Sequence, residues 1–403
     1  MEIGEDIGNV GLINDLAMKN PSLKKSAIRA AAQRAIQPLE PGDGKTYFYG
    51  TRTNAGRELP PYYIVYFLLV ELLEYPFFGR QEKVAWSIPV QLDGHLFIIE
   101  HRKLGLGIFC RSDEVDERKA KKVVTLIKKG VNAAHPFFES IAADAVSKSK
   151  VNLVNKSAFL FNRFRFFVEQ YEKVLEEAKQ KQGEKIVEVK ELEHGTVTSY
   201  HFSAFEIERN AKWLALAAID SFFSWTEHVF IHLSVLLDNI VTATEVADLA
   251  EAEWIKKFKS VLPLEEIETK KFYDELVVIR RQFRNYIAHG AFGKQGEAFE
   301  FHSPVGAVPV LLPHKVNANR FTIVREFEFD ERSALDIIEK FIAHLWSAER
   351  KPAYHYIQES GLPTILTMAA DGSYQAAMQS VEAMESFIEY LHYQFDMAAN
   401  MDW

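Results

Sequence analysis

Residues 204–240 read AFEIERNAKWLALAAIDSFFSWTEHVFIHLSVLLDNI, and this stretch decides the fold. Its apolar residues recur at the spacing of an α-helix and occupy most of the helical circumference. A helix that is apolar on most sides lies inside a bundle rather than on a surface. The C-terminal half of the chain is therefore predicted to be a helical bundle.

The sequence after this stretch continues the bundle and then interrupts it. Two more helices are predicted over 244–261 and 264–289, the second with acidic residues in its first turn and Gly290 as its C-terminal cap. Residues 297–328 then alternate like strands around three prolines, which indicates a β insertion. Helical spacing resumes over 332–349 and 373–398.

The sequence before this stretch carries both helical and strand patterns. Helical spacing predicts helices over 22–36, 62–75, 115–147 and 158–182. The last helix ends in the charged sequence EEAKQKQGEK (176–185), which we interpret as a boundary loop.

Three short strands are predicted between the second and third of these helices. They are KVAWSIPVQL (83–92), HLFIIEH (95–101) and GLGIFC (105–110), and Asp93-Gly94 is a hairpin-turn dipeptide. The expected fold class is therefore mainly α with a smaller α+β part. An N-terminal α+β domain over 1–150, with a sensing or regulatory role, would precede a helical bundle over 151–403.

Composition indicates the cellular compartment of the protein and limits the kinds of partner it can bind. The net charge of −9 argues against nucleic-acid binding over the whole protein surface, so any contact with nucleic acid is expected to be local. Cys110 is the only cysteine, which rules out an intrachain disulfide and a Cys-rich zinc site. The N-terminus is acidic where a signal peptide is basic, and the apolar stretch Tyr62–Val70 is shorter than the roughly 20 residues of a membrane span. We expect a cytoplasmic protein without membrane contact.

The residues that can carry chemistry lie in VVIRRQFRNYIAHGAFG (277–293), at the end of the helix predicted over 264–289. At about 100° per residue, Arg281, Asn285 and His289 form a ladder on one helical face, and Arg284 lies about 140° from His289. Six basic residues stand against two acidic ones from Lys270 to Lys294, a local charge of +4 in an acidic protein. A phosphate would bind here.

These residue types suit the cleavage of RNA. RNA supplies its own nucleophile, the 2′-hydroxyl, and cleavage needs a base for its proton and a cation for the charge on the transition state. His289 fits the acid/base role and Arg284 the stabilising role, while Asn285 would orient the histidine or hold a phosphate oxygen. Arg280 and Arg281 would draw RNA in, and Glu227 is a candidate partner that positions Arg284.

An Arg, a polar residue, three further residues and a His at the end of a bundle helix resemble the motif of the HEPN family of helical ribonucleases. The resemblance covers about residues 202–398. It implies a bundle of four or five helices, RNA cleavage without metal or cofactor that leaves a 2′,3′-cyclic phosphate, and a homodimer with a composite active site. It also implies a toxin–antitoxin or antiviral setting and a regulatory protein partner. Some family toxins carry a modified Tyr two residues after the His, where this chain has Ala291.

Other interpretations of the same residues remain open. A non-catalytic HEPN-like module that binds RNA or a protein would use the same basic cluster for recognition alone, and a purely structural dimerisation bundle is a third alternative. Basic groups near a helix end can simply cap its carbonyls, and Glu227 can be an ordinary surface acid. His228 and His232 have the spacing of metal ligands but are expected to be core or surface residues.

Overall fold

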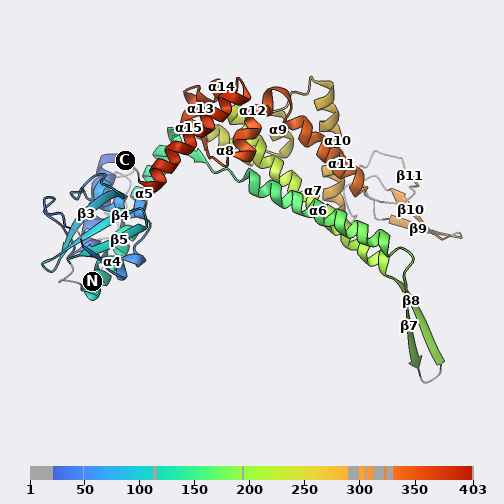
Figure 1. Cartoon of the computed structure of the whole chain (residues 1–403), viewed down its shortest axis with the longest axis horizontal. Coiled ribbons are helices and arrows are strands. Elements are labelled where there is room, and N and C mark those ends of the chain that lie inside the picture. The colour runs from blue at the N-terminus through green and yellow to red at the C-terminus, as the bar shows by residue number, and fades with distance from the viewer. Residues whose placement is uncertain are drawn as a thin grey trace, which may run out of the picture. The chain divides into compact units, whose positions relative to one another are not determined.

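The computed structural model of the protein describes residues 21–401, apart from Tyr49 and residues 112–115, 193–194, 289–298, 305, 312–321 and 324–329. It is mainly helical with small antiparallel sheets, as the sequence predicts (Figure 1). The chain divides into two compact units, Met1–Lys148 with Tyr390–Trp403, and Ser149–Glu389. Residues 390–403, which were predicted to belong to the second domain, cluster with the first unit.

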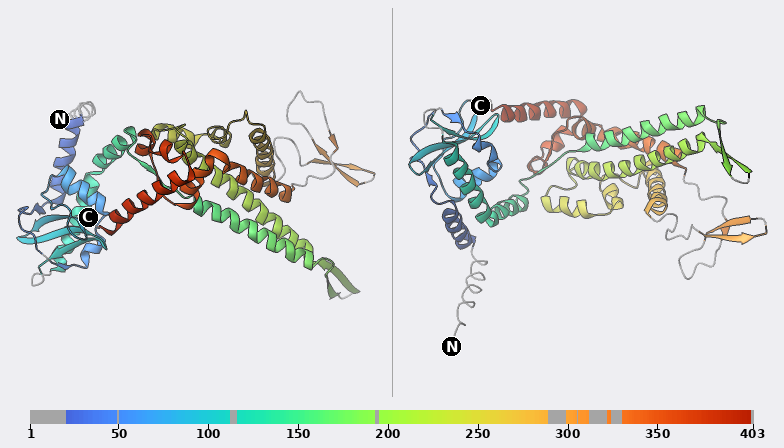
Figure 2. Two further views of the ribbon diagram at one scale, coloured as in Figure 1. Left: turned by 45° about the horizontal axis from the view of Figure 1, so that its top comes forward. Right: turned by 90° about the horizontal axis from the view of Figure 1, so that it is seen from below.

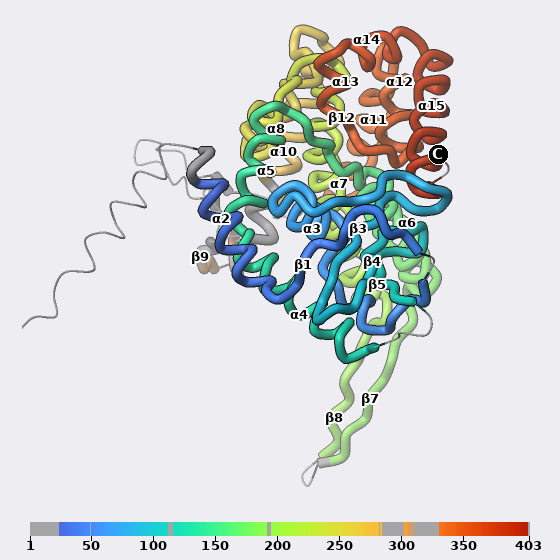
Figure 3. The backbone as a smooth tube through the Cα atoms, turned by 90° about the vertical axis from the view of Figure 1, so that its left-hand side faces the viewer, coloured from blue at the N-terminus to red at the C-terminus, as the bar shows by residue number. Residues whose placement is uncertain are grey.

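The first unit is built on a five-stranded antiparallel sheet with strand order β1-β3-β4-β5-β2 (Figure 3). Its strands are β1 Glu40–Pro41, β2 Thr51–Arg52, β3 Val84–Leu92, β4 His95–Arg102 and β5 Gly105–Cys110. The three predicted strands are confirmed as β3, β4 and β5. Asp93 and Gly94 have φ angles of 49° and 76°, the left-handed pair that a tight two-residue hairpin turn requires.

Helices cover this sheet and complete the core of the first unit. They are α2 Pro21–Ile36, α3 Tyr62–Tyr66, α4 Glu117–Ala133 and α5 His135–Ser147, with a short 3₁₀ helix η1 Ala55–Glu58 and a π-helical segment η2 Phe67–Leu72. The prediction of one helix over 115–147 is wrong. Pro136 stands in the first turn of α5, and because proline has no backbone N–H it ends the preceding helix.

The close approach of α2 and α4 depends on one glycine. A Cβ atom on Gly130 would lie only 2.4 Å from Cγ2 of Ile36, so a larger residue would push the two helices apart. Around this contact Ile36, Leu68 and Ile127 are fully buried together with the apolar side chains of β3 and β4. The helices and one face of the sheet therefore share a single core.

The second unit is dominated by two long helices that run side by side, α6 Ser157–Gln180 and α7 Ser203–Leu236 (Figure 2). Helix α7 confirms the prediction for residues 204–240, and most of its side chains from Ala218 onward are buried. A hairpin of β7 Lys185–Leu192 and β8 Gly195–Phe202 joins the two helices. The boundary loop expected at 176–185 is therefore wrong, because this connection lies within one unit.

Shorter helices follow this pair in the chain, and the last of them continues into the residues that cluster with the first unit. They are α8 Ala243–Glu251, α9 Trp254–Lys259, α10 Ile267–Ala288, α11 Glu331–Leu345, α12 Lys351–Tyr354, α13 Leu366–Ala370, α14 Ser373–Ala377 and α15 Val381–Asn400, with the short segments η3 Ala348–Arg350 and η4 His355–Glu359. The single helices predicted over 244–261 and 373–398 are each divided in two. The core of the second unit contains Phe222, Trp225, Trp254, Phe258 and Phe341, all fully buried.

Short strands complete the second unit. Strand β6 Asn152–Leu153 pairs with β12 Thr364–Ile365. In the predicted β insertion, β9 Phe299–Ser303, β10 Gly306–Leu311 and β11 Thr322–Ile323 form an antiparallel sheet in the order β11-β10-β9. None of the helices in the described part of the chain is long and apolar enough to cross a lipid bilayer.

Candidate functional site

The predicted catalytic motif lies at the C-terminal end of α10. The backbone is helical through Arg284 and Asn285 and up to Ala288, so Arg281 and Asn285 stand one turn apart on the same side of the helix. The side chains of Arg284 and Asn285 lie outside what the structure describes, as does the whole of His289. Arg281 is exposed on this helix.

Glu227 on α7 lies where α7, α9 and α10 meet. Its Oε2 accepts a hydrogen bond from Nζ of Lys257 at 2.9 Å, and its Oε1 accepts one from Nη2 of Arg280 at 3.2 Å. It is therefore not an isolated surface acid. The described partner on α10 is Arg280, one turn before the Arg284 that the sequence analysis considered.

Lys257 is the most buried charged member of this cluster. Its side chain is 5% exposed, against 33% for Glu227 and 38% for Arg280. A buried ammonium group is costly unless a counter-charge compensates it, and Glu227 supplies that counter-charge. One carboxylate thus joins a buried cation to a half-buried one and ties three helices together.

Arg280 is also held by aromatic rings. Its guanidinium carbon lies 5.6 Å from the ring centroids of both Phe223 and Trp254, within the range of a cation–π contact. Trp254 is fully buried, and its indole N–H donates to Oγ1 of Thr226 at 2.9 Å. These contacts hold the side chain of Arg280 against the bundle, while 38% of it remains exposed. The role expected for Arg280, drawing RNA in, stays a prediction. Arg281 next to it is the exposed cation.

His228 and His232 serve the structure of the bundle. Nε2 of His228 accepts the backbone N–H of Lys156 at 2.9 Å, and Nδ1 of His232 lies 2.7 Å from Oγ1 of Thr364. Burial lowers the pKa of His228 to about 4 and that of His232 to about 3, with Lys156 adding to the first effect and His228 to the second. Both imidazoles are neutral at neutral pH. Among the described residues, no group of three His, Cys, Asp or Glu side chains is placed to hold a metal ion.

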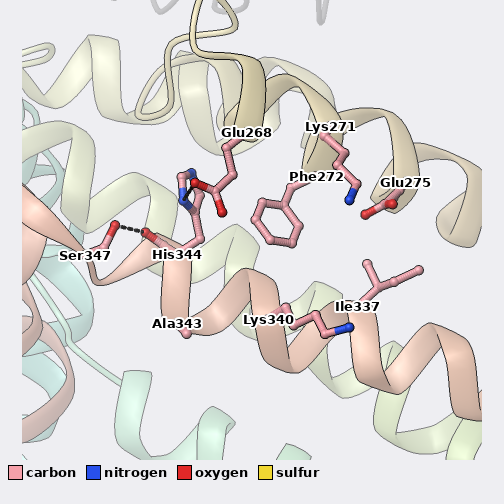
Figure 4. A pocket seen from close by; sticks show the side chains of 9 residues that line it. All are labelled: Glu268, Lys271, Phe272, Glu275, Ile337, Lys340, Ala343, His344 and Ser347. Atoms are coloured by element: carbon pink, nitrogen blue, oxygen red, sulfur yellow. Dashed lines mark hydrogen bonds and ion pairs between the residues drawn. The ribbon is translucent and has the colours of Figure 1, made fainter.

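A groove of about 480 Å³ lies between α10 and α11 (Figure 4). It is lined by Glu268, Lys271, Phe272, Glu275, Ile337, Lys340, Ala343, His344 and Ser347. In Figure 4 Lys271 and Lys340 extend toward the groove from opposite helices, and Phe272 forms its floor beside His344. Two lysines face two carboxylates here, so the groove carries no strong excess of either charge.

His344, in this groove, was not predicted from the sequence as a site residue. Its Nε2 lies 2.8 Å from Oγ1 of Thr269, and its Nδ1 lies 4.0 Å from Oε2 of Glu268. Burial and Arg350 lower the pKa of His344, while Glu268 and Glu266 oppose the shift. Because Glu268 and His344 are far apart in sequence and no motif joins them, only the packing of α10 on α11 could reveal this pair.

Comparison of the chain with protein-family models, with curated proteins and with solved structures finds no match to any of them.

Proposed function

We propose that the protein is a metal-independent endoribonuclease whose catalytic residues are Arg284, Asn285 and His289. The observation that carries the proposal is the position of the motif: Arg284 and Asn285 close a helix of the bundle, and His289 follows its last residue, Ala288. The resemblance of this sequence to the HEPN motif supports the same reading. No cofactor is needed for this reaction.

The reaction would proceed by attack of the 2′-hydroxyl on the adjacent phosphate. The bond from O2′ to phosphorus forms and the bond from phosphorus to O5′ breaks, which leaves a 2′,3′-cyclic phosphate and a 5′-hydroxyl. His289 acts as the general acid/base in these proton transfers. Arg284 stabilises the negative charge of the transition state, and Asn285 positions the histidine or a phosphate oxygen.

The neighbouring residues then divide into two roles. Arg281 is exposed and attracts the RNA backbone, whereas Arg280, held by Glu227, Phe223 and Trp254, keeps α10 in place. Glu227 acts through Arg280 and is a positioning residue. The site would work in a cytoplasmic homodimer in which two motifs meet, in a toxin or antiviral setting, with the N-terminal unit or a partner protein as its regulator.

The test is cleavage of total RNA and of a labelled transfer RNA in the presence of EDTA, with analysis of the fragment ends. We expect the wild type to cut and His289→Ala and Arg284→Ala to lose at least about a hundredfold in rate, with RNA binding retained in His289→Ala. His392→Ala is the matched control, because His392 is an exposed histidine on a different helix, α15.

A second experiment separates attraction of RNA from catalysis. Arg281→Ala should weaken RNA binding and lower the slope of log affinity against log salt by about one, as expected for the loss of one phosphate contact. Intact RNA with the wild-type protein, together with measurable RNA binding, would replace the nuclease proposal with the alternative of a non-catalytic binding module. Cleavage that His289→Ala does not reduce would remove His289 from the mechanism.

A further inference from the structure

The hairpin between α6 and α7 is an exposed element of the second unit. Strands β7 and β8 pair from Lys185 opposite Phe202 to Leu192 opposite Gly195, at the far end of the two long helices (Figures 1 and 2). Every side chain described in the two strands is exposed. Within the described part of the chain, neither strand has a second neighbour, so each leaves one edge of backbone N–H and C=O groups unpaired by a strand.

Such a hairpin is expected to need a partner. A two-stranded sheet alone is marginally stable in water, and free edges template the addition of further strands. The hairpin also exposes apolar side chains on both faces, with exposed fractions between 42% and 62%: Ile186, Val187, Val189, Val197, Tyr200 and Phe202. The apolar surface continues onto α7, where the ring of Phe205 is 67% exposed and lies 5.8 Å from that of Phe202.

We propose that the free edge of β7 pairs antiparallel with β7 of a second copy of this chain, with Val189 opposite Val189 of the partner subunit. The two hairpins would then form one four-stranded sheet around a two-fold axis. This inference goes beyond the proposed function, because it holds whether or not the protein cleaves RNA.

The charges of β7 select both the strand and the register. A two-fold axis perpendicular to the sheet requires that one residue of β7 faces its own copy, because opposite residues must point to the same face. With Val189 at the axis, Glu188 faces Lys190 of the partner subunit and Lys190 faces the partner's Glu188. These two ion pairs on either side of the axis make the pairing complementary in charge, while Val187 faces Glu191 of the partner subunit.

The alternative pairings lack this complementarity. An axis at Glu188 would place two carboxylates opposite each other, and an axis at Lys190 would place two ammonium groups opposite each other, both of which are destabilising. The sequence of β8, GTVTSYHF, contains no Asp, Glu, Lys or Arg, so its edge offers no charge pairing of this kind. The edge of β7 centred on Val189 is therefore the one that fits a second copy.

The first test measures the mass of the full-length protein in solution by light scattering and by sedimentation over a range of concentrations. We expect a dimer whose dissociation constant rises at least about tenfold in Glu188→Lys and in Lys190→Glu, because each variant sets like charges opposite each other twice. The double variant Glu188→Lys/Lys190→Glu should recover the wild-type dissociation constant. Both side chains are exposed, and circular dichroism would confirm that the variants are folded.

The second test reads the register directly. In Val189→Cys the two thiols would face each other, whereas in Val187→Cys they would be separated by roughly 13 Å along the strands. Oxidation should therefore link two chains rapidly only in Val189→Cys, and the wild type controls for Cys110, which is buried. A monomeric wild-type protein, a double variant that stays dissociated, or equal cross-linking of the two cysteine variants would overturn the proposal.

Discussion

Replacement of Glu227 by glutamine should destabilise the second unit by about 2–3 kcal/mol. The change keeps the shape of the side chain but removes the charge that faces Lys257, whose side chain is only 5% exposed. Removal of one partner of a buried ion pair costs about 3–5 kcal/mol, because the other charge is left uncompensated. A third of the Glu227 side chain reaches solvent, which lowers the expected cost to or slightly below the bottom of that range, about 2–3 kcal/mol.

The effect can be measured as a shift of the melting temperature. For a domain of this size each kcal/mol corresponds to about 2–4 °C, so Glu227→Gln should melt about 4–12 °C lower than the wild type. Glu208→Gln is the matched control, because Glu208 is an exposed acid on the same helix, α7. It should change the melting temperature by no more than about 2 °C.

A second variant tests the cause of the destabilisation expected in Glu227→Gln. Lys257→Met replaces the buried cation by an apolar side chain of similar length, which should cost no more than about 1 kcal/mol, because Glu227 keeps Arg280 and some contact with water. Glu227→Gln should then add little in the Lys257→Met background. If Lys257→Met destabilises the protein as much as Glu227→Gln, the loss of stability does not come from an uncompensated charge on Lys257, and the prediction is wrong.

Two further predictions concern the core of each unit. Because burial depresses the folded-state pKa of His228 and His232 below the ordinary value of 6.5, their contribution to stability is full above pH 6.5 and is lost as the pH falls toward 4 and 3. Urea denaturation should show stability falling between pH 7 and 5 by on the order of 2 kcal/mol for each of the two histidines, and a weaker pH dependence in His232→Gln. In the first unit, Gly130→Ala should destabilise by about 1–3 kcal/mol despite the better helix propensity of alanine, because its Cβ would meet Ile36 at 2.4 Å. Thermal melting would check this against Gly79→Ala, where a Cβ meets nothing within 4 Å.

Local sequence patterns determined those elements whose periodicity is unmistakable. The apolar residues of 204–240 predicted α7 because a helix buried on most sides leaves few positions for polar residues. The strands β3, β4 and β5 were predicted because β-branched residues flank Asp93-Gly94, a dipeptide that tolerates positive φ at both positions. These features depend only on neighbours in sequence.

Other elements were missed or merged although the sequence carried a signal. Pro136 divides the helix predicted over 115–147, and the density of β-branched residues in 185–202 indicates a hairpin that the charged sequence before it obscured. Because both faces of this hairpin are exposed, its apolar and polar residues do not alternate clearly.

The surroundings of the candidate site were decided by tertiary structure alone. Glu227 and Arg280 are separated by 53 residues, and their contact, like the burial of Lys257, depends on how α7, α9 and α10 pack. The same holds for His344 and Glu268 across α10 and α11. The motif of Arg284, Asn285 and His289 was proposed from the sequence alone, because the three residues are close together in the chain and span about one and a half helical turns. Partners that are brought together by folding leave no local pattern, since the energy that pairs them acts through space and not along the chain.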